Sequence, residues 1–283
     1  TLLLDPGAGH TITFNGNAYN TGIADDSAAS IIPSGGFNYI PSGSGADVHI
    51  QSGLVVFNGN NVYSGQTILE GGTLQAQDAA GIYWDSNINF KGTTTSNAVL
   101  MSNGLFNRYV GTLSNRVQWT GSGGFAAVAG DLTVNLSNGQ TVSWNIGGFV
   151  KNGDALIFGA DQATDNVYFQ NAIDLRGGSR TVLSTTSSAA SGTNTDGTPL
   201  GSTVYMSGRI MDTTGGGSLN INDANHDGAV VLDGASTYTG TTNINAGTVL
   251  LNGSLASSSV NVSSTATLDS INGGLAGVST VTN

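Results

Sequence analysis

Three oxygen-bearing side chains, each two residues apart, form the best candidate for a metal site in this sequence. Asp223, Asn225 and Asp227 are followed by Gly228, and this spacing can bring carboxylate and amide oxygens to one point while the glycine allows a sharp bend. A calcium loop of this kind needs a bidentate acid at its twelfth position, which here is Gly234. A plain turn between two strands therefore competes with a calcium loop. Calcium is the one cofactor that the pattern suggests.

Catalytic side chains form no clear constellation. The chain has three histidines, His10, His49 and His226. None lies in a G-x-S-x-G or H-E-x-x-H motif, so the sequence gives no support for a serine hydrolase or a zinc peptidase. Asp174 with Arg176 and Arg180 faintly resembles the acid and arginine set of β-helical lyases. Turn and surface charge explain these residues as well. We therefore expect no catalytic residue and no enzyme, with a carbohydrate-active enzyme as the alternative.

Aromatic side chains could instead bind sugars by stacking. The chain has three tryptophans, Trp84, Trp119 and Trp144. All three stand in strand-like contexts, and we expect them to pack in the core or at its corners. An exposed aromatic face would favour a glycan-binding adhesin tip, so surface glycans stay among the possible partners.

Charge excludes several partner classes. Only 9% of the residues are charged, and the net charge is −11. No basic patch exists, so we expect neither nucleic-acid binding nor docking on anionic membranes. No apolar stretch reaches the ~18 residues of a membrane-spanning helix, so no membrane insertion by this segment is expected.

The composition favours an extracellular all-β chain. Glycine supplies 43 of 283 residues, and cysteine is absent. Asn, Ser and Thr replace the Glu and Lys of helix surfaces, so extensive helix is not expected. Proteins that cross an outer membrane unfolded often lack cysteine. The first residue, Thr1, is not an initiator methionine, so we expect a portion of a longer protein.

Short alternating segments that end in Gly, Asn or Asp predict the rungs of a parallel β-helix. The clearest segments are residues 11–14, 47–50, 131–136, 140–145, 248–251 and 259–262. Ser137-Asn138-Gly139 joins two of them, either as a hairpin turn or as a corner of one coil. Residues 20–46 and 184–202 read as loop insertions in a single solenoid over residues 1–283. The aromatic-rich span 84–182 reads as a thicker part of it, with an inserted β-sandwich as the alternative.

One segment occurs twice, at residues 53–77 and 228–252, and the two copies align without a gap. Such self-similarity indicates a repeat architecture. We expect Tyr63 and Tyr238 to occupy equivalent positions, and Gly65 and Gly240 equivalent corners with positive φ. The identical pairs are Gly53/Gly228, Val55/Val230, Val56/Val231, Gly59/Gly234, Tyr63/Tyr238, Gly65/Gly240, Thr67/Thr242, Gly72/Gly247 and Thr73/Thr248.

This repeat resembles the passenger-associated repeat of bacterial autotransporters. The resemblance rests on Tyr-x-Gly-x-Thr followed by Gly-Thr, at Tyr63–Leu74 and Tyr238–Val249. It implies a right-handed parallel β-helix, an extracellular or cell-surface location, and a structural or adhesive role without catalytic residues. The strand-like runs 1–4 and 277–283 carry neither charge nor proline to blunt an edge. We therefore expect either a continuing parent chain or contacts between copies, end to end or lateral.

Overall fold

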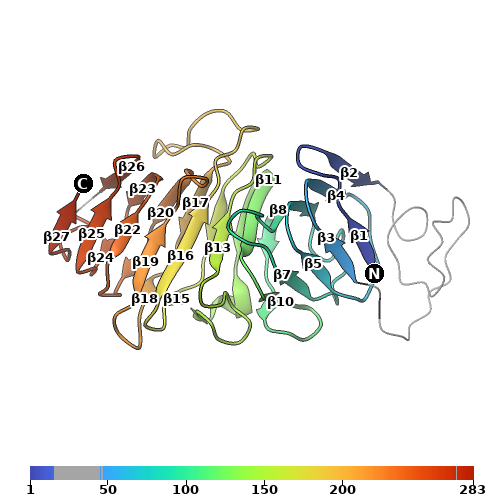
Figure 1. Cartoon of the computed structure of the whole chain (residues 1–283), viewed down its shortest axis with the longest axis horizontal. Helices are drawn as coiled ribbons and strands as arrows, with labels where there is room; N and C mark the ends of the chain where they lie inside the picture. The colour runs from blue at the N-terminus through green and yellow to red at the C-terminus, as the bar shows by residue number, and fades with distance from the viewer. Residues whose placement is uncertain (16–44, 46, 272) are drawn as a thin grey trace, which may run out of the picture.

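The computed structural model describes residues 1–15, 45, 47–271 and 273–283, so the predicted insertion 20–46 lies, apart from Gly45, outside the described residues. The chain forms an elongated stack of coils with its two termini at opposite ends (Figure 1). Most strands pair in parallel with the strands one coil before and after them, as β5 does with β3 and β7. Stacking satisfies the backbone of each coil with its neighbours, because one rung cannot bury a core alone. The predicted parallel β-helix is confirmed.

Two rows of strands build the N-terminal half. The first row is β1 (Leu2–Leu4), β3 (Val48–Ile50), β5 (Thr67–Leu69), β7 (Ile88–Phe90) and β10 (Arg116–Trp119), with β9 (Tyr109–Val110) beside β10. The second row is β2 (Thr11–Phe14), β4 (Leu54–Phe57), β6 (Thr73–Ala76), β8 (Val99–Phe106) and β11 (Gly123–Val134). Successive strands of one coil therefore belong to different rows and lie on different faces of the solenoid.

The long strand β11 divides the second row into two. Its first part, Gly123–Phe125, pairs with β13 (Ala155–Phe158), and its last part, Leu132–Val134, pairs with β14 (Val167–Phe169). The register shifts between Ala127 and Leu132, where Ala129 and Gly130 have positive φ. Such an irregularity bends a strand. β11 therefore turns a corner, and the solenoid gains a face there.

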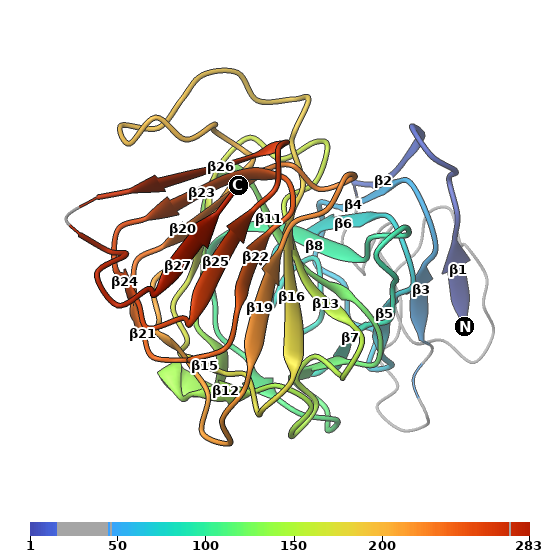
Figure 2. The same ribbon diagram turned by 60° about the vertical axis from the view of Figure 1, so that its left-hand side comes forward.

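The C-terminal half continues both branches in parallel (Figure 2). From β13 the row runs through β16 (Ser179–Ser184), β19 (Ser218–Ile221), β22 (Thr242–Ile244), β25 (Ser259–Val262) and β27 (Thr280–Thr282). From β14 it runs through β17 (Thr203–Met206), β20 (Ala229–Leu232), β23 (Gly247–Leu251) and β26 (Ala266–Ser270). Smaller ladders are β12 (Val142–Ser143), β15 (Ile173–Asp174) and β18 (Ile210–Met211), and β21 (Ala235–Ser236) with β24 (Ser254–Leu255).

The segment between β11 and β12 resolves one open alternative. Leu136–Gly139 forms the short 3₁₀ turn η1, in which Ser137, Asn138 and Gly139 all have positive φ. β12 pairs with β15 and not with β11. The Ser-Asn-Gly sequence is therefore a corner of one coil and not a hairpin turn. Within the described residues no helix is long and apolar enough to cross a membrane.

A continuous apolar core runs along the solenoid from Leu4 to Val260. Its wide middle is filled by aromatic rings: Phe90 lies 5.0 Å from Trp119, and Trp119 lies 5.1 Å from Phe149, measured between ring centroids. The prediction of packed tryptophans is correct for Trp119 and Trp144, which are 0% and 1% exposed. It is wrong for Trp84, which is 54% exposed and lies in a turn between β6 and β7.

The two copies of the repeat share their local structure. β4, β5 and β6 of the first copy correspond to β20, β22 and β23 of the second. In both copies a glycine with positive φ, Gly72 or Gly247, lies against the carbonyl oxygen of the glycine that opens the copy, Gly53 or Gly228. A Cβ atom there would approach that oxygen to 2.5 Å or 2.3 Å, respectively.

The expectation for Gly240 is wrong in its cause. Neither Gly240 nor its counterpart Gly65 has a positive φ. A Cβ atom on Gly240 would instead lie 2.1 Å from the carbonyl oxygen of Gly217 in the preceding coil. Glycine is required there because the two backbones approach so closely, and not because of a left-handed conformation.

Outer faces carry ladders of polar side chains. The amide of Asn243 donates to Asn220 at 2.8 Å, and the amide of Asn261 donates to Asn243 at 2.8 Å. Thr282 then donates to Asn261 at 2.7 Å. These side chains satisfy one another along the stack, as the abundance of Asn, Ser and Thr predicts. Hydrogen bonds therefore link coils on the outside as well as through the backbone.

We expect the free energy of unfolding to fall at acidic pH because of Glu70, whose carboxylate links three coils. Gln51 and Lys91 donate to its carboxylate at 3.0 and 2.9 Å, and together they lower its pKa from 4.5 to about 2. A lowered carboxyl pKa adds stability above the unfolded pKa, and this stability is lost as the pH falls through the folded one. The full shift would correspond to about 3 kcal/mol, but Glu70 lies near the surface and solvent screens its partners, so between pH 4.5 and 2 the chain should lose on the order of 1–2 kcal/mol through this group.

Urea unfolding at several pH values measures this loss. Glu70→Gln is the matched variant, since it keeps the shape and removes the titration. The difference in unfolding free energy between wild type and variant should shrink as the pH falls. An unchanged difference from pH 6 to pH 2.5 would contradict the assignment.

The predicted loop 184–202 corresponds to residues 185–202, which connect β16 to β17 and stand off the stack at the top of Figure 1. Side-chain hydrogen bonds fix this connection to the solenoid near its start and farther along it. Ser187 donates to the carbonyl oxygen of Asp161 at 2.9 Å, and Tyr205 of β17 donates to Asp196 at 2.9 Å. Ser184 itself belongs to β16.

Candidate functional site

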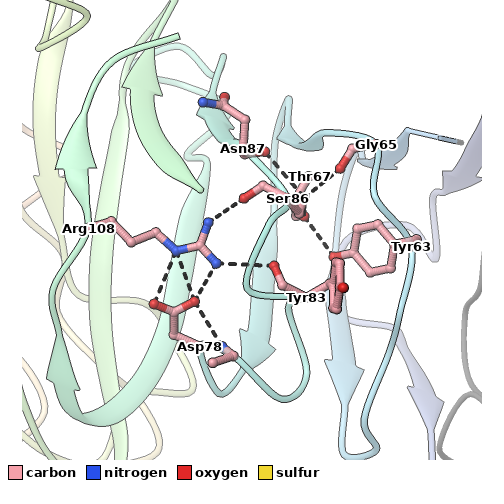
Figure 3. Close-up of polar contacts among 9 residues, drawn as sticks. Tyr63, Gly65, Thr67, Asp78, Tyr83, Ser86, Asn87 and Arg108 are labelled. Carbon is pink, nitrogen blue, oxygen red and sulfur yellow. Dashed lines mark hydrogen bonds and ion pairs between the residues drawn. The ribbon is translucent and has the colours of Figure 1, made fainter. Parts of the chain in front are cut away.

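Arg108 lies buried between neighbouring coils, just after β8, with only 5% of its side chain exposed. Its Nε donates to both carboxylate oxygens of Asp78, at 2.9 and 3.1 Å. Its other nitrogens donate to the carbonyl oxygens of Tyr83 and Ser86 (Figure 3). A guanidinium with this fork geometry fixes several partners at once. Arg108 therefore holds the 78–86 connection in one conformation.

A chain of buried hydroxyls adjoins this arginine. The Tyr63 hydroxyl lies 2.7 Å from Thr67 Oγ1, which lies 2.9 Å from Ser86 Oγ, and Ser86 donates to the carbonyl oxygen of Gly65 at 2.6 Å (Figure 3). Burial, the dominant cause, raises the pKa of Tyr63 far above its ordinary value. The tyrosine is therefore a neutral hydrogen-bonding group and not a base.

The second copy repeats this hydroxyl chain. Tyr238 lies 2.6 Å from Thr242 Oγ1, Thr242 donates to Ser257 at 3.0 Å, and Ser257 donates to the carbonyl oxygen of Gly240 at 2.6 Å. The equivalence predicted for Tyr63 and Tyr238 is thus seen in their partners. Ser86 and Ser257 lie outside the copies defined from the sequence, in the coil that follows each copy.

Removing either tyrosine hydroxyl should destabilise the chain by about 1–2 kcal/mol, because a buried threonine hydroxyl loses one of its two partners. Tyr63→Phe and Tyr238→Phe test this by urea unfolding. Since the two sites lie far apart and share no partner, their effects should add in the double variant. Tyr83→Phe is the control, since its ring is only partly buried and its hydroxyl is not a member of the buried Tyr63–Thr67–Ser86 hydrogen-bond chain. A strong shortfall from additivity would contradict two independent, equivalent sites.

A shallow hollow of about 250 Å³ opens beside the Arg108–Asp78 pair. Its walls come from successive coils, since Trp84 follows β6, Tyr109 begins β9 and Asn115 precedes β10. Trp84 and Tyr109 are 54% and 46% exposed. The lining residues are Asp78, Ala79, Trp84, Asn107, Arg108, Tyr109 and Asn115.

The candidate calcium ligands lie in a tight turn between β19 and β20. Asp223 accepts a hydrogen bond from the backbone of Asn225 at 2.9 Å, and its Oδ1 lies 2.7 Å from Nδ1 of His226. Asp227 instead accepts from Thr186, in the 185–202 connection. The two carboxylates thus have different partners. Among the described residues, no three His, Cys, Asp or Glu side chains form a group that could hold a metal ion.

We expect calcium to leave the thermal stability almost unchanged. The carboxylates of Asp223 and Asp227 already accept hydrogen bonds from protein groups, so a cation would have to displace those partners. Melting curves with millimolar calcium and with a chelator measure the effect. A rise of many degrees, lost in Asp223→Asn, would instead assign Asp223, Asn225 and Asp227 as ligands.

The residues that suggested a lyase are engaged in the structure. Arg180 is buried, donates to the carbonyl oxygen of Leu175 at 2.6 Å and lies 5.9 Å from the Trp144 ring centroid. Asp174 accepts from Thr213 at 2.6 Å, and Arg176 lies 3.9 Å from its carboxylate. These contacts stabilise the corners between coils.

Sequence reasoning missed Arg108 and the hollow. Asp78 and Arg108 are 30 residues apart, and only the coil length brings them together. One signal was available at Trp84. It is followed at once by Asp85, Ser86 and Asn87, which are turn residues, so the indole lies outside any alternating strand pattern.

Comparison with known proteins identifies the repeat. The family model described as the passenger-associated-transport-repeat matches residues 51–76 and 227–251. These are the two copies identified above at 53–77 and 228–252. No curated protein and no solved structure matches the chain. The predicted resemblance to the passenger repeat of autotransporters is thus confirmed, and the chain carries two such repeats.

Proposed function

We propose that this chain is a structural and adhesive segment of a bacterial surface or secreted protein of the autotransporter-passenger type. The carrying observation is the repeat itself, which matches the passenger-associated family twice. Both copies have the same buried Tyr–Thr–Ser chain and the same glycine contact within one stack of coils. Repeats of this kind propagate a solenoid, and an elongated solenoid carries a binding surface away from its point of attachment.

The side chains support a role that is not enzymatic. Within the described part of the chain, the two buried arginines hold neighbouring coils together, Arg108 through Asp78 and Arg180 through Asn152. The carboxylates of Asp78 and Asp174 accept hydrogen bonds from structural partners. Since the sequence contains no cysteine, no disulfide bond contributes to stability. Packing of the core, parallel strand ladders and hydrogen bonds on the outer faces stabilise the chain.

Surface display is tested on intact cells that produce the parent protein. Antibodies raised against the purified chain should label unpermeabilised cells, and external protease should remove the label. A periplasmic protein of the same cells serves as the control for leakage. Labelling that requires lysis of the cells would overturn the proposed location.

Association between copies, end to end or lateral, belongs to the same proposal. Light scattering of the purified chain over a range of concentrations tests it, with deletion of residues 1–4 and 278–283 as the comparison. A mass that stays monomeric at high concentration would remove self-association from the proposal and leave surface display intact.

A further inference from the structure

Trp84 is exposed although the solenoid has buried its other tryptophans. Trp119 and Trp144 are at most 1% exposed, whereas Trp84 is 54% exposed. Its indole is not loosely placed. The ring centroids of Trp84 and Tyr83 lie 5.6 Å apart. Arg108 fixes the backbone of this turn, and so does the backbone N–H of Asn115, which donates to the carbonyl oxygen of Asp85. Tryptophan is enriched among the residues that carry most of the binding energy at interfaces, so an exposed indole in a fixed turn is a candidate contact residue.

Tyr109 faces the same hollow from the next coil. Arg116 stacks on its ring at 4.6 Å, and Asn138 donates to its hydroxyl. Leu113, in the adjoining loop, is 69% exposed, and Ile146 is 53% exposed in the next loop. Gly111 and Gly148, which flank these two loops, lie in close contact. Two further exposed apolar side chains thus lie in the loops after β9 and β12, although neither lines the hollow.

Planar polar groups complete the lining. Both oxygens of Asp78 are held by Arg108, so the carboxylate is oriented and its charge is compensated. The side chains of Asn107 and Asn115 are exposed beside it. The hollow therefore combines two exposed aromatic rings with an oriented carboxylate and exposed amide groups, and its lining residues carry no uncompensated charge.

We propose that this hollow binds a neutral sugar residue of a glycan. A pyranose has one apolar face of C–H groups, which can stack on the Trp84 indole, and hydroxyls that suit amide and carboxylate groups. Anionic ligands are disfavoured, since Arg108, the basic residue among those that line the hollow, is already paired and the chain carries a net charge of −11. At about 250 Å³ the hollow is slightly smaller than the ~300 Å³ of the smallest drug-sized sites. It therefore suits one or two sugar residues.

Rigidity of the walls favours binding, because the site is already ordered. Arg108 ties Asp78, Tyr83 and Ser86 together before any ligand arrives, so little conformational entropy is lost on binding. A single shallow hollow gives modest affinity, and many copies on a cell surface would add avidity. This inference supplies the ligand for the adhesive part of the proposed function, and it rests on that function for the source of the glycan.

Tryptophan fluorescence tests the site directly, because Trp84 is the one exposed tryptophan of the three. The purified chain is titrated with methyl glycosides of glucose, galactose, mannose and N-acetylglucosamine and with lactose, cellobiose and chitobiose. N-acetylneuraminic acid is the acidic probe. At least one neutral sugar should shift the emission saturably and protect it from acrylamide. Failure of the whole neutral panel, or response to the acidic sugar alone, would overturn the proposal.

Variants then locate the binding, with calorimetry as the readout. Trp84→Ala should weaken binding at least tenfold and Asn115→Ala severalfold, whereas Trp84→Phe should retain part of it. Ile271→Ala, which removes an apolar side chain that is 42% exposed and does not line the hollow, should bind like the wild type. Equal melting temperatures establish that the variants fold. Wild-type affinity in Trp84→Ala would overturn the site. Because binding is measured on purified chain, its failure is distinct from a failure of surface labelling.

Discussion

Replacing Gly247 by alanine is expected to destabilise the C-terminal coils by about 3 kcal/mol or more, since two costs coincide there. Gly247 has a φ of +66°, which side chains with a Cβ rarely adopt. A Cβ atom would also lie 2.3 Å from the carbonyl oxygen of Gly228, which belongs to the preceding coil and cannot move without breaking its ladder. Urea unfolding followed by circular dichroism measures the loss.

Two control variants separate the two costs. Gly153→Ala meets a φ of +87° with no atom within 4 Å of the new Cβ, so it should cost only about 1 kcal/mol. Gly240→Ala meets no positive φ but a backbone oxygen at 2.1 Å, so it isolates the close approach. Gly247→Ala should cost more than Gly153→Ala. Equal losses in these two would show that the coils can separate locally and would contradict a tightly stacked repeat.

These glycines show what a repeat reveals and what it hides. Aligning the two copies identified Gly72 and Gly247 as equivalent, and the structure gives both the same contact. The alignment also paired Gly65 with Gly240, but the positive φ expected of Gly240 is absent. The alignment of the two copies indicates positions at which glycine is required. The reason for the requirement depends on the distance to the backbone of the neighbouring coil, which no local sequence pattern encodes.

Strand positions were easier to predict than their faces. Residues 11–14 and 259–262 form strands with the predicted bounds, because alternation and turn residues act locally. The division of β11 into two rows was not predictable. It depends on the bend between Ala127 and Leu132, where Ala129 adopts an unusual positive φ. As a result, β5 and β22 occupy the same place in the repeat but belong to different sheets of the solenoid.

The candidate site was the least predictable part. Asp223, Asn225 and Asp227 attracted attention because they are neighbours in sequence, yet their side chains have separate partners. Asp78 and Arg108, which form the buried pair, are separated by a full coil. In a solenoid, side chains one coil apart meet, and the coil length varies along this chain. Local spacing therefore finds turns well and finds sites poorly.

Arg108→Met is the other substitution with a large expected effect. Methionine fills similar space, but the carboxylate of Asp78 and the carbonyl oxygens of Tyr83 and Ser86 lose their donor. Breaking a buried ion pair from one side costs about 3–5 kcal/mol. Because 21% of the Asp78 side chain is exposed and water can replace part of the loss, we expect about 3 kcal/mol, at the low end of this range. Urea unfolding of the variant measures it.

The double variant shows where that free energy comes from. If an unpaired Asp78 carboxylate causes most of the loss, adding Asp78→Ala to Arg108→Met should restore part of the stability, giving a coupling well above the error of about 0.5 kcal/mol. Arg116→Met is the matched control. Arg116 is half-buried and stacks on Tyr109, and among the described residues it has no carboxylate partner, so its loss should cost no more than about 1 kcal/mol. If Arg108→Met is as mild as this control, the solenoid does not depend on the pair, and the walls of the hollow must be held by backbone contacts alone.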